Sequence, residues 1–139
     1  QLVNEDIKKI GDHDTAMILM KSKKGVLIHI NNSRRAVYGY DQRVEIFGSK
    51  GMLLSNNQTP TSIEKFNETG TFIKEPIYNF FIERYDQAYK AQIDDFVEKI
   101  ENKQQPSVTF EDGRKALILA NTAYKSLENN SSAKVKYEF

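Results

Sequence analysis

The spacing of apolar residues changes between about residues 75 and 84, and that change restricts the fold more than any other feature. Up to about residue 75, short apolar runs such as 15–20 and 26–30 are separated by clusters of Gly, Asn, Ser and Lys, as in β-hairpins. From 84 to 102 and again from 109 to 129, apolar side chains recur every three or four residues, as in amphipathic helices. Strands that come first, followed by helices, predict an α+β fold.

The predicted architecture is an open, mostly antiparallel sheet of about six strands, with the two main helices packed on one face. The expected strands are 15–20, 26–30, 44–47, 52–55, 61–66, 71–74 and, after the helices, 134–139, and residues 1–12 are expected to be irregular or a short edge segment. Ile63 and Phe66 break strict alternation, which indicates a bulge or irregularity there. The second sheet face, with Met17, Leu19 and Leu27, is also apolar, so we expect an oligomer interface.

Two short motifs have structural interpretations. Gly48-Ser49-Lys50-Gly51 would suit a phosphate only if a helix followed it, and a predicted strand follows instead, so we interpret it as a hairpin turn. Thr109 and Asp112 are spaced as in a capping box, which predicts that the second helix begins there. The second helix has few polar positions and is expected to be the more buried of the two.

Composition narrows the class of protein. With 139 residues, 39% of them apolar, the chain can bury one sizeable core, and we expect residues 1–139 to form one domain. The net charge of +1 gives no electrostatic reason to expect nucleic acid or a membrane as partner. The chain has no Cys, no apolar stretch near 18 residues and no leader pattern, so we expect a cytoplasmic protein. Because it begins at Gln1 rather than Met, we expect it to be a fragment.

The densest group of polar side chains lies in residues 31–43, between the second and third predicted strands. Thirteen positions there hold three arginines, two tyrosines, two asparagines and an aspartate, which is more hydrogen-bonding capacity than a plain connection needs. If the backbone is extended, Tyr38 and Tyr40 point to one side, and Gly39 lets a ligand or another loop approach closely. Phenols beside arginines suit a polyol. The candidate substrate-binding residues are Tyr40, Tyr38, Arg35 and Asn32.

A plainer interpretation of the same loop is also open. The two tyrosines would then only pack an interface, and the arginines would only form ion pairs within the loop. The pairs in question join Arg34, Arg35 and Arg43 to Asp41 and Glu45.

The two histidines carry no catalytic pattern. His13 lies between two aspartates just before the first strand and is interpreted as structural or exposed to solvent. His29 lies among apolar residues of the second strand and is interpreted as a hydrogen-bonded sheet histidine or an interface residue. With no Cys and no acidic cluster at helical ligand spacing beyond Asp94-Asp95, no metal site is expected.

Residues 31–52, NNSRRAVYGYDQRVEIFGSKGM, resemble the central segment of the inositol 2-dehydrogenases. These enzymes belong to the larger glucose-fructose oxidoreductase, inositol dehydrogenase and rhizopine-catabolism family of NAD(P)-dependent oxidoreductases. Looser similarity runs through 81–85, 106–109 and 112–114. The resemblance implies a C-terminal, substrate-side and oligomerisation domain. In that family tyrosines of this loop reach the sugar or inositol, a role that the resemblance gives to Tyr40 first and Tyr38 second.

The resemblance also implies what lies elsewhere. No strand–GxGxxG–helix unit occurs in the chain, so NAD would be bound by an N-terminal Rossmann domain outside it. The family's catalytic Lys, His and Asp would lie upstream of Gln1, so this chain alone is expected to be inactive. The expected partners are inositol or a related polyol, that N-terminal domain and further copies of the chain. Two alternatives stay open: an assembly module without substrate contact, and the same family acting on another sugar.

Overall fold

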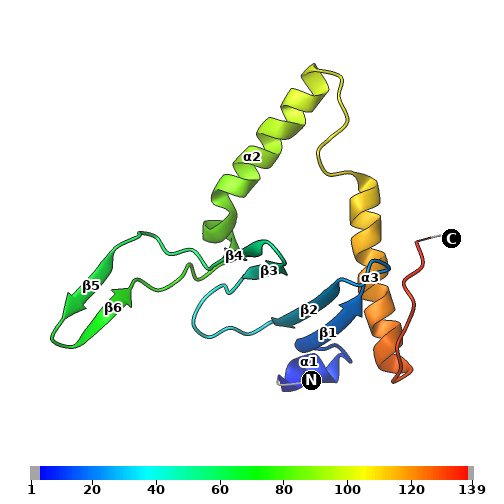
Figure 1. The fold of residues 1–139 in the computed structure, drawn as a ribbon, viewed down its shortest axis with the longest axis horizontal. Coiled ribbons are helices and arrows are strands. Elements are labelled where there is room, and N and C mark those ends of the chain that lie inside the picture. Colours follow the sequence, from blue (N-terminus) through cyan, green and yellow to red (C-terminus); the bar gives the residue numbers. More distant parts are fainter. Residues whose placement is uncertain (1–3, 138–139) are drawn as a thin grey trace. The chain divides into compact units, whose positions relative to one another are not determined.

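The computed structural model describes residues 4–137, which contain three helices and six strands (Figure 1). In chain order these elements are α1 (Glu5–Lys9), β1 (Thr15–Lys21), β2 (Leu27–Ser33), β3 (Val44–Gly48), β4 (Gly51–Ser55), β5 (Glu64–Asn67), β6 (Gly70–Lys74), α2 (Phe81–Glu101) and α3 (Phe110–Glu128). The chain divides into two units within α2, the first ending at Tyr89 and the second beginning at Lys90. None of the described helices is long and apolar enough to cross a membrane. The predicted α+β class is confirmed.

The strands form three separate two-stranded sheets, each an antiparallel hairpin of consecutive strands: β1–β2, β3–β4 and β5–β6. The prediction of one open sheet is therefore wrong for the described residues. Pairing across a short turn closes a small loop at little entropic cost, whereas joining the hairpins requires their edges to meet. The connection 34–43 instead makes hydrogen bonds with Asn57, in the connection that follows β4.

The β1–β2 hairpin has one strongly exposed apolar face. Leu19 pairs with His29 and Lys21 with Leu27, so these residues share a side with Met17. The exposed fractions of Met17, Leu19 and Leu27 are 72%, 82% and 78%. We call Met17, Leu19, Leu27 and His29 the open face of β1–β2. The register confirms the predicted grouping of the three apolar residues, and the subunit interface stays a prediction.

The other two hairpins follow the local sequence signals. Gly48 pairs with Gly51 across the Ser49-Lys50 turn, so the hairpin interpretation of this Gly-rich segment is confirmed. In β5–β6 the register shifts between Lys65 and Asn67, which confirms the predicted irregularity.

The segment before β1 contains a short helix, α1, where we predicted an irregular or edge segment. Oδ1 of Asn4 accepts a hydrogen bond from the backbone N–H of Asp6 at 2.8 Å, and so caps the helix. Acidic residues occupy its first turn and basic residues its last, which suits the helix dipole. Lys9 also pairs with Asp6 at 2.9 Å, one turn apart. These local contacts explain the helix, which is too short to show a clear apolar period.

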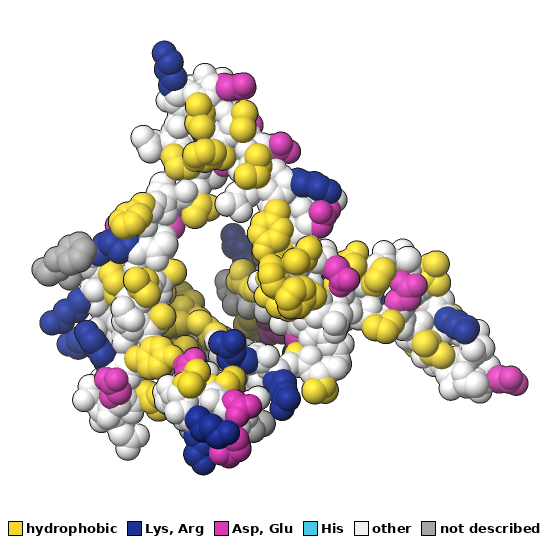
Figure 2. All heavy atoms as spheres, turned by 180° about the vertical axis from the view of Figure 1, so that it is seen from behind, with side chains coloured by type: hydrophobic (Ala, Val, Ile, Leu, Met, Phe, Trp, Pro, Cys, Tyr) yellow, Lys and Arg dark blue, Asp and Glu magenta, His cyan; other side chains and the backbone are white. Residues whose placement is uncertain are grey.

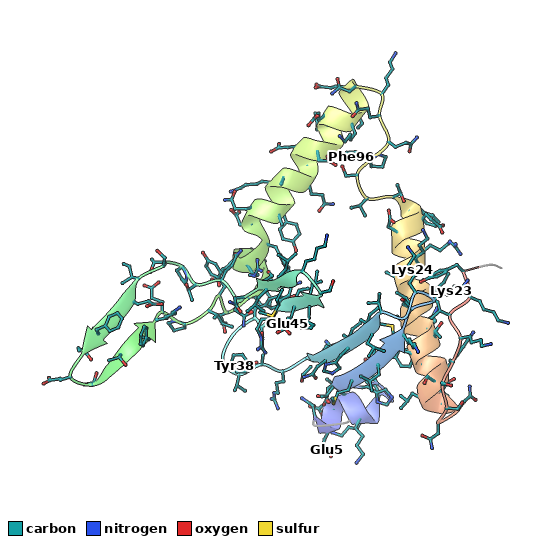
Figure 3. All side chains as sticks on the ribbon, viewed as in Figure 1. Glu5, Lys23, Lys24, Tyr38, Glu45 and Phe96 are labelled. Carbon is teal, nitrogen blue, oxygen red and sulfur yellow. The ribbon has the colours of Figure 1, made fainter. Side chains whose placement is uncertain are left out.

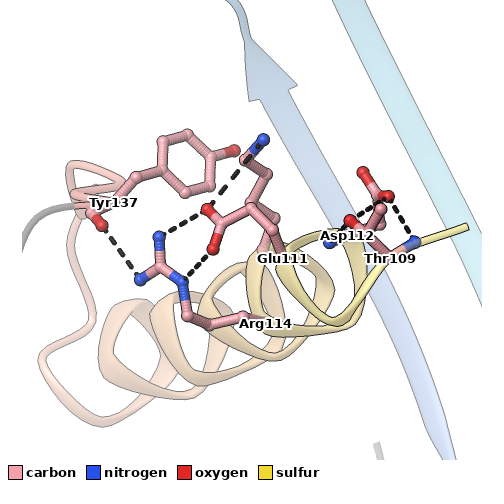
Figure 4. A network of polar contacts seen from close by, with 6 residues as sticks. Thr109, Glu111, Asp112, Arg114 and Tyr137 are labelled. Carbon is pink, nitrogen blue, oxygen red and sulfur yellow. Dashed lines mark hydrogen bonds and ion pairs between the residues drawn. The ribbon is translucent and has the colours of Figure 1, made fainter. Parts of the chain in front are cut away.

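The predicted capping box at the start of α3 is confirmed (Figure 4). The Thr109 side chain accepts from the backbone N–H of Asp112, whose carboxylate accepts from the backbone N–H of Thr109 at 2.9 Å. These reciprocal bonds satisfy backbone groups that would otherwise lack partners at the helix end. The sequence signal therefore located the helix start to the residue.

Arg114 ties the segment after α3 back to the helix (Figure 4). Its guanidinium binds Glu111 through two hydrogen bonds, of 2.7 and 2.6 Å, and donates a third to the backbone oxygen of Tyr137 at 3.0 Å. The predicted last strand is not present at 134–137, because the backbone oxygen of Tyr137 meets a side chain rather than a neighbouring strand. Residues 138–139 lie outside the described part.

None of the apolar side chains in residues 4–137 is buried. The single core and single domain expected from the sequence stay predictions. Figure 2 shows apolar side chains spread over the visible surface. On α2, Ile93, Phe96 and Ile100 are 62%, 54% and 62% exposed, although their spacing is that of an amphipathic helix. Figure 3 shows Phe96 on this helix. The packing of the two main helices on one face of a sheet stays a prediction.

Candidate functional site

Residues 34–43 between β2 and β3, which we call the tyrosine loop, fold around the carboxylate of Asp41. Arg43 binds this carboxylate through two hydrogen bonds, from Nε to Oδ1 and from Nη2 to Oδ2, each 2.8 Å. The Tyr38 hydroxyl donates to Oδ2, and Nδ2 of Asn57 donates to Oδ1 at 2.8 Å. We call these four residues the Asp41 cluster. The Asp41 side chain is only 15% exposed, so its position is set by these charge-assisted bonds.

The Asp41 cluster fixes the ionisation of its members. Hydrogen bonds from Arg43 first, and then from Tyr38 and Asn57, hold the pKa of the Asp41 carboxyl well below its usual range. The hydrogen bond to the carboxylate raises the pKa of the Tyr38 hydroxyl, and the same carboxylate raises the pKa of Arg43. The Tyr38 hydroxyl and the Arg43 guanidinium thus both donate hydrogen bonds to Asp41 within the loop. The charges of Arg43 and Asp41 balance each other.

Gly39 lets a second segment approach the tyrosine loop. It is buried with φ +132°, and a Cβ built on it would lie 2.4 Å from Cγ1 of Ile77 and 3.1 Å from the backbone oxygen of Tyr78. No side chain fits at that distance. The next residue, Tyr40, donates its backbone N–H to the same Tyr78 oxygen at 2.8 Å. The close approach predicted for Gly39 is therefore made by another part of the chain.

The Tyr40 ring packs against α2. Its centroid lies 5.7 Å from that of Tyr85 at an interplanar angle of 82°, an edge-to-face contact. A hydrogen bond with Tyr85, followed by partial burial, raises the pKa of Tyr40. The Tyr85 hydroxyl in turn donates to Oε1 of Gln42. Tyr40 is half-buried and neutral at ordinary pH, so its phenol can act by hydrogen bonding rather than as an anion.

Asn57 joins the Asp41 cluster to the contacts of Tyr85. Its Nδ2 donates to Asp41, while its Oδ1 accepts from the backbone N–H of Gln42 at 2.7 Å. Gln42 then accepts from Tyr85 through its own side chain. A series of contacts therefore runs from Asp41 through Asn57 to the backbone of Gln42, and from the Gln42 side chain to the tyrosine that meets Tyr40.

The candidate residues do not all come together. The chain turns at Val37 and Tyr38, so the extended backbone assumed for the tyrosines is absent, and Tyr38 meets Asp41 while Tyr40 meets Tyr85. Figure 3 shows Tyr38 on the loop between β2 and β3. Asn32 lies in β2 opposite Ala16, and the backbone of Arg35 donates to Ser33 at 3.3 Å. Asn32 and Arg35 are exposed and lie outside the cluster.

The plainer interpretation of the loop is confirmed in one part, the ion pair between Arg43 and Asp41. The sequence reasoning missed Asn57 and Tyr85. Asn57 lies between the predicted strands 52–55 and 61–66, where no motif singles it out, and Tyr85 fits the apolar period of the helix. The looser resemblance at 81–85 was the only signal that pointed to Tyr85.

Neither histidine joins this site. The backbone N–H of His13 donates to Asp12 at 2.7 Å, and His29 is exposed opposite Leu19 on β1–β2. Within residues 4–137, no group of three His, Cys, Asp or Glu side chains could hold a metal ion.

Comparison with known proteins gives consistent matches along almost the whole chain. The family model described as "Oxidoreductase family, C-terminal alpha/beta domain" matches residues 2–136. The myo-inositol 2-dehydrogenase of Thermotoga maritima is 44% identical over 135 residues, which cover 97% of this chain and 40% of that protein. This chain therefore spans about 40% of the length of that relative.

Two solved structures extend the match to the fold. The crystal structure of a myo-inositol dehydrogenase from Corynebacterium glutamicum superposes with a TM-score of 0.87 at 44% identity, over 94% of this chain and 39% of that one. The scyllo-inositol dehydrogenase of Lactobacillus casei, solved with bound NAD(H) and scyllo-inositol, gives 0.81 at 30% identity, over 94% and 38%.

Proposed function

This chain belongs to the oxidoreductase family whose C-terminal alpha/beta domain it matches, and from that premise we propose that it is the substrate-side domain of an NAD-dependent inositol dehydrogenase. Its share in that enzyme is one wall of the polyol pocket, formed by the tyrosine loop. Tyr40 is the first binding residue, and Tyr38, Arg35 and Asn32 line the approach. The names of the relatives favour inositol over other sugars.

One observation carries this proposal: polar contacts within the tyrosine loop and with Asn57, together with close packing at Gly39, hold the loop in place. Asp41 accepts four hydrogen bonds, and Gly39 packs directly against Ile77. A phenol that is fixed before the ligand arrives binds with a smaller entropic cost than one on a mobile loop. A pre-organised binding surface accounts for the polar residues of this loop that bind one another, Tyr38, Asp41 and Arg43.

The residues of this chain do not fit the pyrophosphate of NAD. Its Gly-rich turn at 48–51 joins two strands, whereas a pyrophosphate site needs a helix that begins directly after the turn. We therefore assign NAD, which accepts the hydride in such enzymes, to an N-terminal dinucleotide-binding domain of the whole protein. We assign no catalytic residue to this chain, and we expect the chain alone to be inactive.

The test compares variants of the complete polypeptide that carries this chain, by NADH formation with myo-inositol. Tyr40→Phe removes one hydroxyl and should lower kcat/KM about 3- to 10-fold, mostly through KM, the size of one hydrogen bond. Tyr137→Phe removes a hydroxyl in the second unit and serves as the matched control. Equal kinetic constants for both variants and the wild type would remove Tyr40 from the pocket. No NADH from the wild-type polypeptide, with any inositol or sugar tried, would end the proposal.

The alternative is an assembly module without substrate contact, and the open face of β1–β2 favours it. Three large apolar side chains there are more than 70% exposed. Under this alternative, Tyr40→Phe should change the oligomer size, measured by sedimentation, and leave the kinetics near normal. Under the proposal the oligomer keeps its size and KM rises. The two roles can also coexist, with the face serving assembly and the loop serving substrate.

A further inference from the structure

We propose that Asp41 is a positioning residue for Tyr40, and that it acts through Asn57, Gln42 and Tyr85. This inference rests on the proposed function, because it takes Tyr40 as the residue that contacts the polyol. It adds a role for a carboxylate that does not itself face the substrate.

The first link is the amide of Asn57, which is held at both ends. Its Nδ2 donates to Oδ1 of Asp41 at 2.8 Å, and its Oδ1 accepts from the backbone N–H of Gln42 at 2.7 Å. An amide group has donors at one end and an acceptor at the other. The carboxylate of Asp41, which only accepts, therefore decides which way the amide faces, and leaves its oxygen for Gln42.

The second link runs from Gln42 to the tyrosines. Oε1 of Gln42 accepts from the Tyr85 hydroxyl, and the Tyr85 ring meets Tyr40 edge to face at 5.7 Å. On its other side, Tyr85 meets Tyr89 at 6.2 Å and 73°. The backbone of Tyr40 is fixed separately by its bond to the Tyr78 oxygen. The Tyr40 ring thus depends on Tyr85 for its direction, and Tyr85 depends on where Gln42 places its side-chain oxygen.

Two of the residues that bind Asp41 are largely exposed, so a change at Asp41 should affect the loop rather than the stability of the whole fold. Tyr38 and the Arg43 side chain are both 61% exposed, so their bonds to Asp41 contribute little to the stability of the fold. Asp41 itself is only 15% exposed. Losing its charge should therefore disturb the loop geometry while the fold stays intact.

The experiment is a double-mutant cycle in the complete polypeptide, with KM for myo-inositol as the readout. Asp41→Asn should raise KM about 3- to 10-fold and change kcat by less than about twofold. In the Tyr40→Phe background, the same change should raise KM by less than about twofold, because the phenol that it positions is gone. The same factor in both backgrounds, or no effect in either, would overturn the inference.

Gln42 gives a second test at an exposed position where folding is not at risk. Gln42→Leu removes the acceptor for Tyr85 and should raise KM as Asp41→Asn does, whereas Gln42→Glu keeps an acceptor and should stay near wild type. Equal KM values for Gln42→Leu and Gln42→Glu would also overturn the inference. If KM responds to Tyr40→Phe but not to Asp41→Asn, only this inference fails. If the wild-type polypeptide oxidises no inositol, the proposed function fails with it.

Discussion

The tyrosine loop and the open face of β1–β2 lie in the same unit, yet different forces determine their structures. The polar groups of the loop have partners, some within the loop and some in other segments: Asp41 binds Arg43 and Asn57, and Gly39 packs against Ile77. The open face has a defined register but leaves Met17, Leu19 and Leu27 more than 70% exposed. Polar groups with directional bonds can fix a loop locally, whereas an apolar face is stabilised only by what covers it. The loop should thus respond to changes of geometry, and the face to changes of hydrophobicity.

Gly39→Ala should give the largest effect, because it breaks the loop at its closest contact. The new Cβ would lie 2.4 Å from Ile77, at a φ of +132° that L-residues rarely adopt. Strain and overpacking together should lower the free energy of unfolding by about 2–4 kcal/mol. Gly25→Ala is the matched control, with positive φ and no atom within 4 Å, and should cost only about 1–2 kcal/mol. Thermal unfolding of the complete polypeptide measures both, and equal shifts would contradict the close contact.

Leu19→Ser tests the open face of β1–β2. If a second copy covers the open face, each buried leucine contributes about 1.5–3 kcal/mol to assembly, so the dissociation constant should rise at least about tenfold. Val37→Ser is the control, because Val37 is 93% exposed in the tyrosine loop. Sedimentation over a concentration series measures the change. An unchanged dissociation constant for Leu19→Ser would show that this face remains exposed to solvent and is not part of a subunit interface.

Whether a feature could be predicted from the sequence depends on how far apart in the chain its interacting residues lie. The hairpin turn at 48–51 and the capping box at Thr109 are local, so the sequence predicted them correctly. The partners of the loop are not local: Asn57 lies 16 residues from Asp41, and Tyr85 lies 43 residues from Gln42. The periodicity of apolar residues gives no information about such contacts. The single sheet was predicted wrongly for the same reason, because pairing between hairpins depends on edges far apart in the sequence.

Thr109→Val, at the start of α3, should have a smaller effect than either of the first two changes. It removes the hydroxyl that accepts from the Asp112 backbone and should cost about 1 kcal/mol of stability, the usual value of an N-cap. Thr122→Val is the matched control on the same helix, because the Thr122 hydroxyl only donates to the Ile118 backbone oxygen at 2.7 Å. Loss of the Thr122 hydroxyl should change the free energy of unfolding by no more than about 0.5 kcal/mol. Similar melting temperatures for the two variants would mean that the capping hydrogen bond does not stabilise α3 by itself. The contribution of the cap would then depend on its surroundings, as that of the open face does.

The smallest effect expected is the pH dependence of the Asp41 cluster, since water screens its exposed members Tyr38 and Arg43. Folding lowers the pKa of Asp41, chiefly through Arg43. Such a group adds stability that is present above its unfolded pKa of about 4 and is lost as pH falls through the lowered folded value. The difference in melting temperature between wild type and Asp41→Asn should be constant from about pH 5 to 8 and shrink below about pH 4. A difference that grows in acid would mean that Asp41 is protonated more easily folded than unfolded, and the loop would then not be held by its own charges.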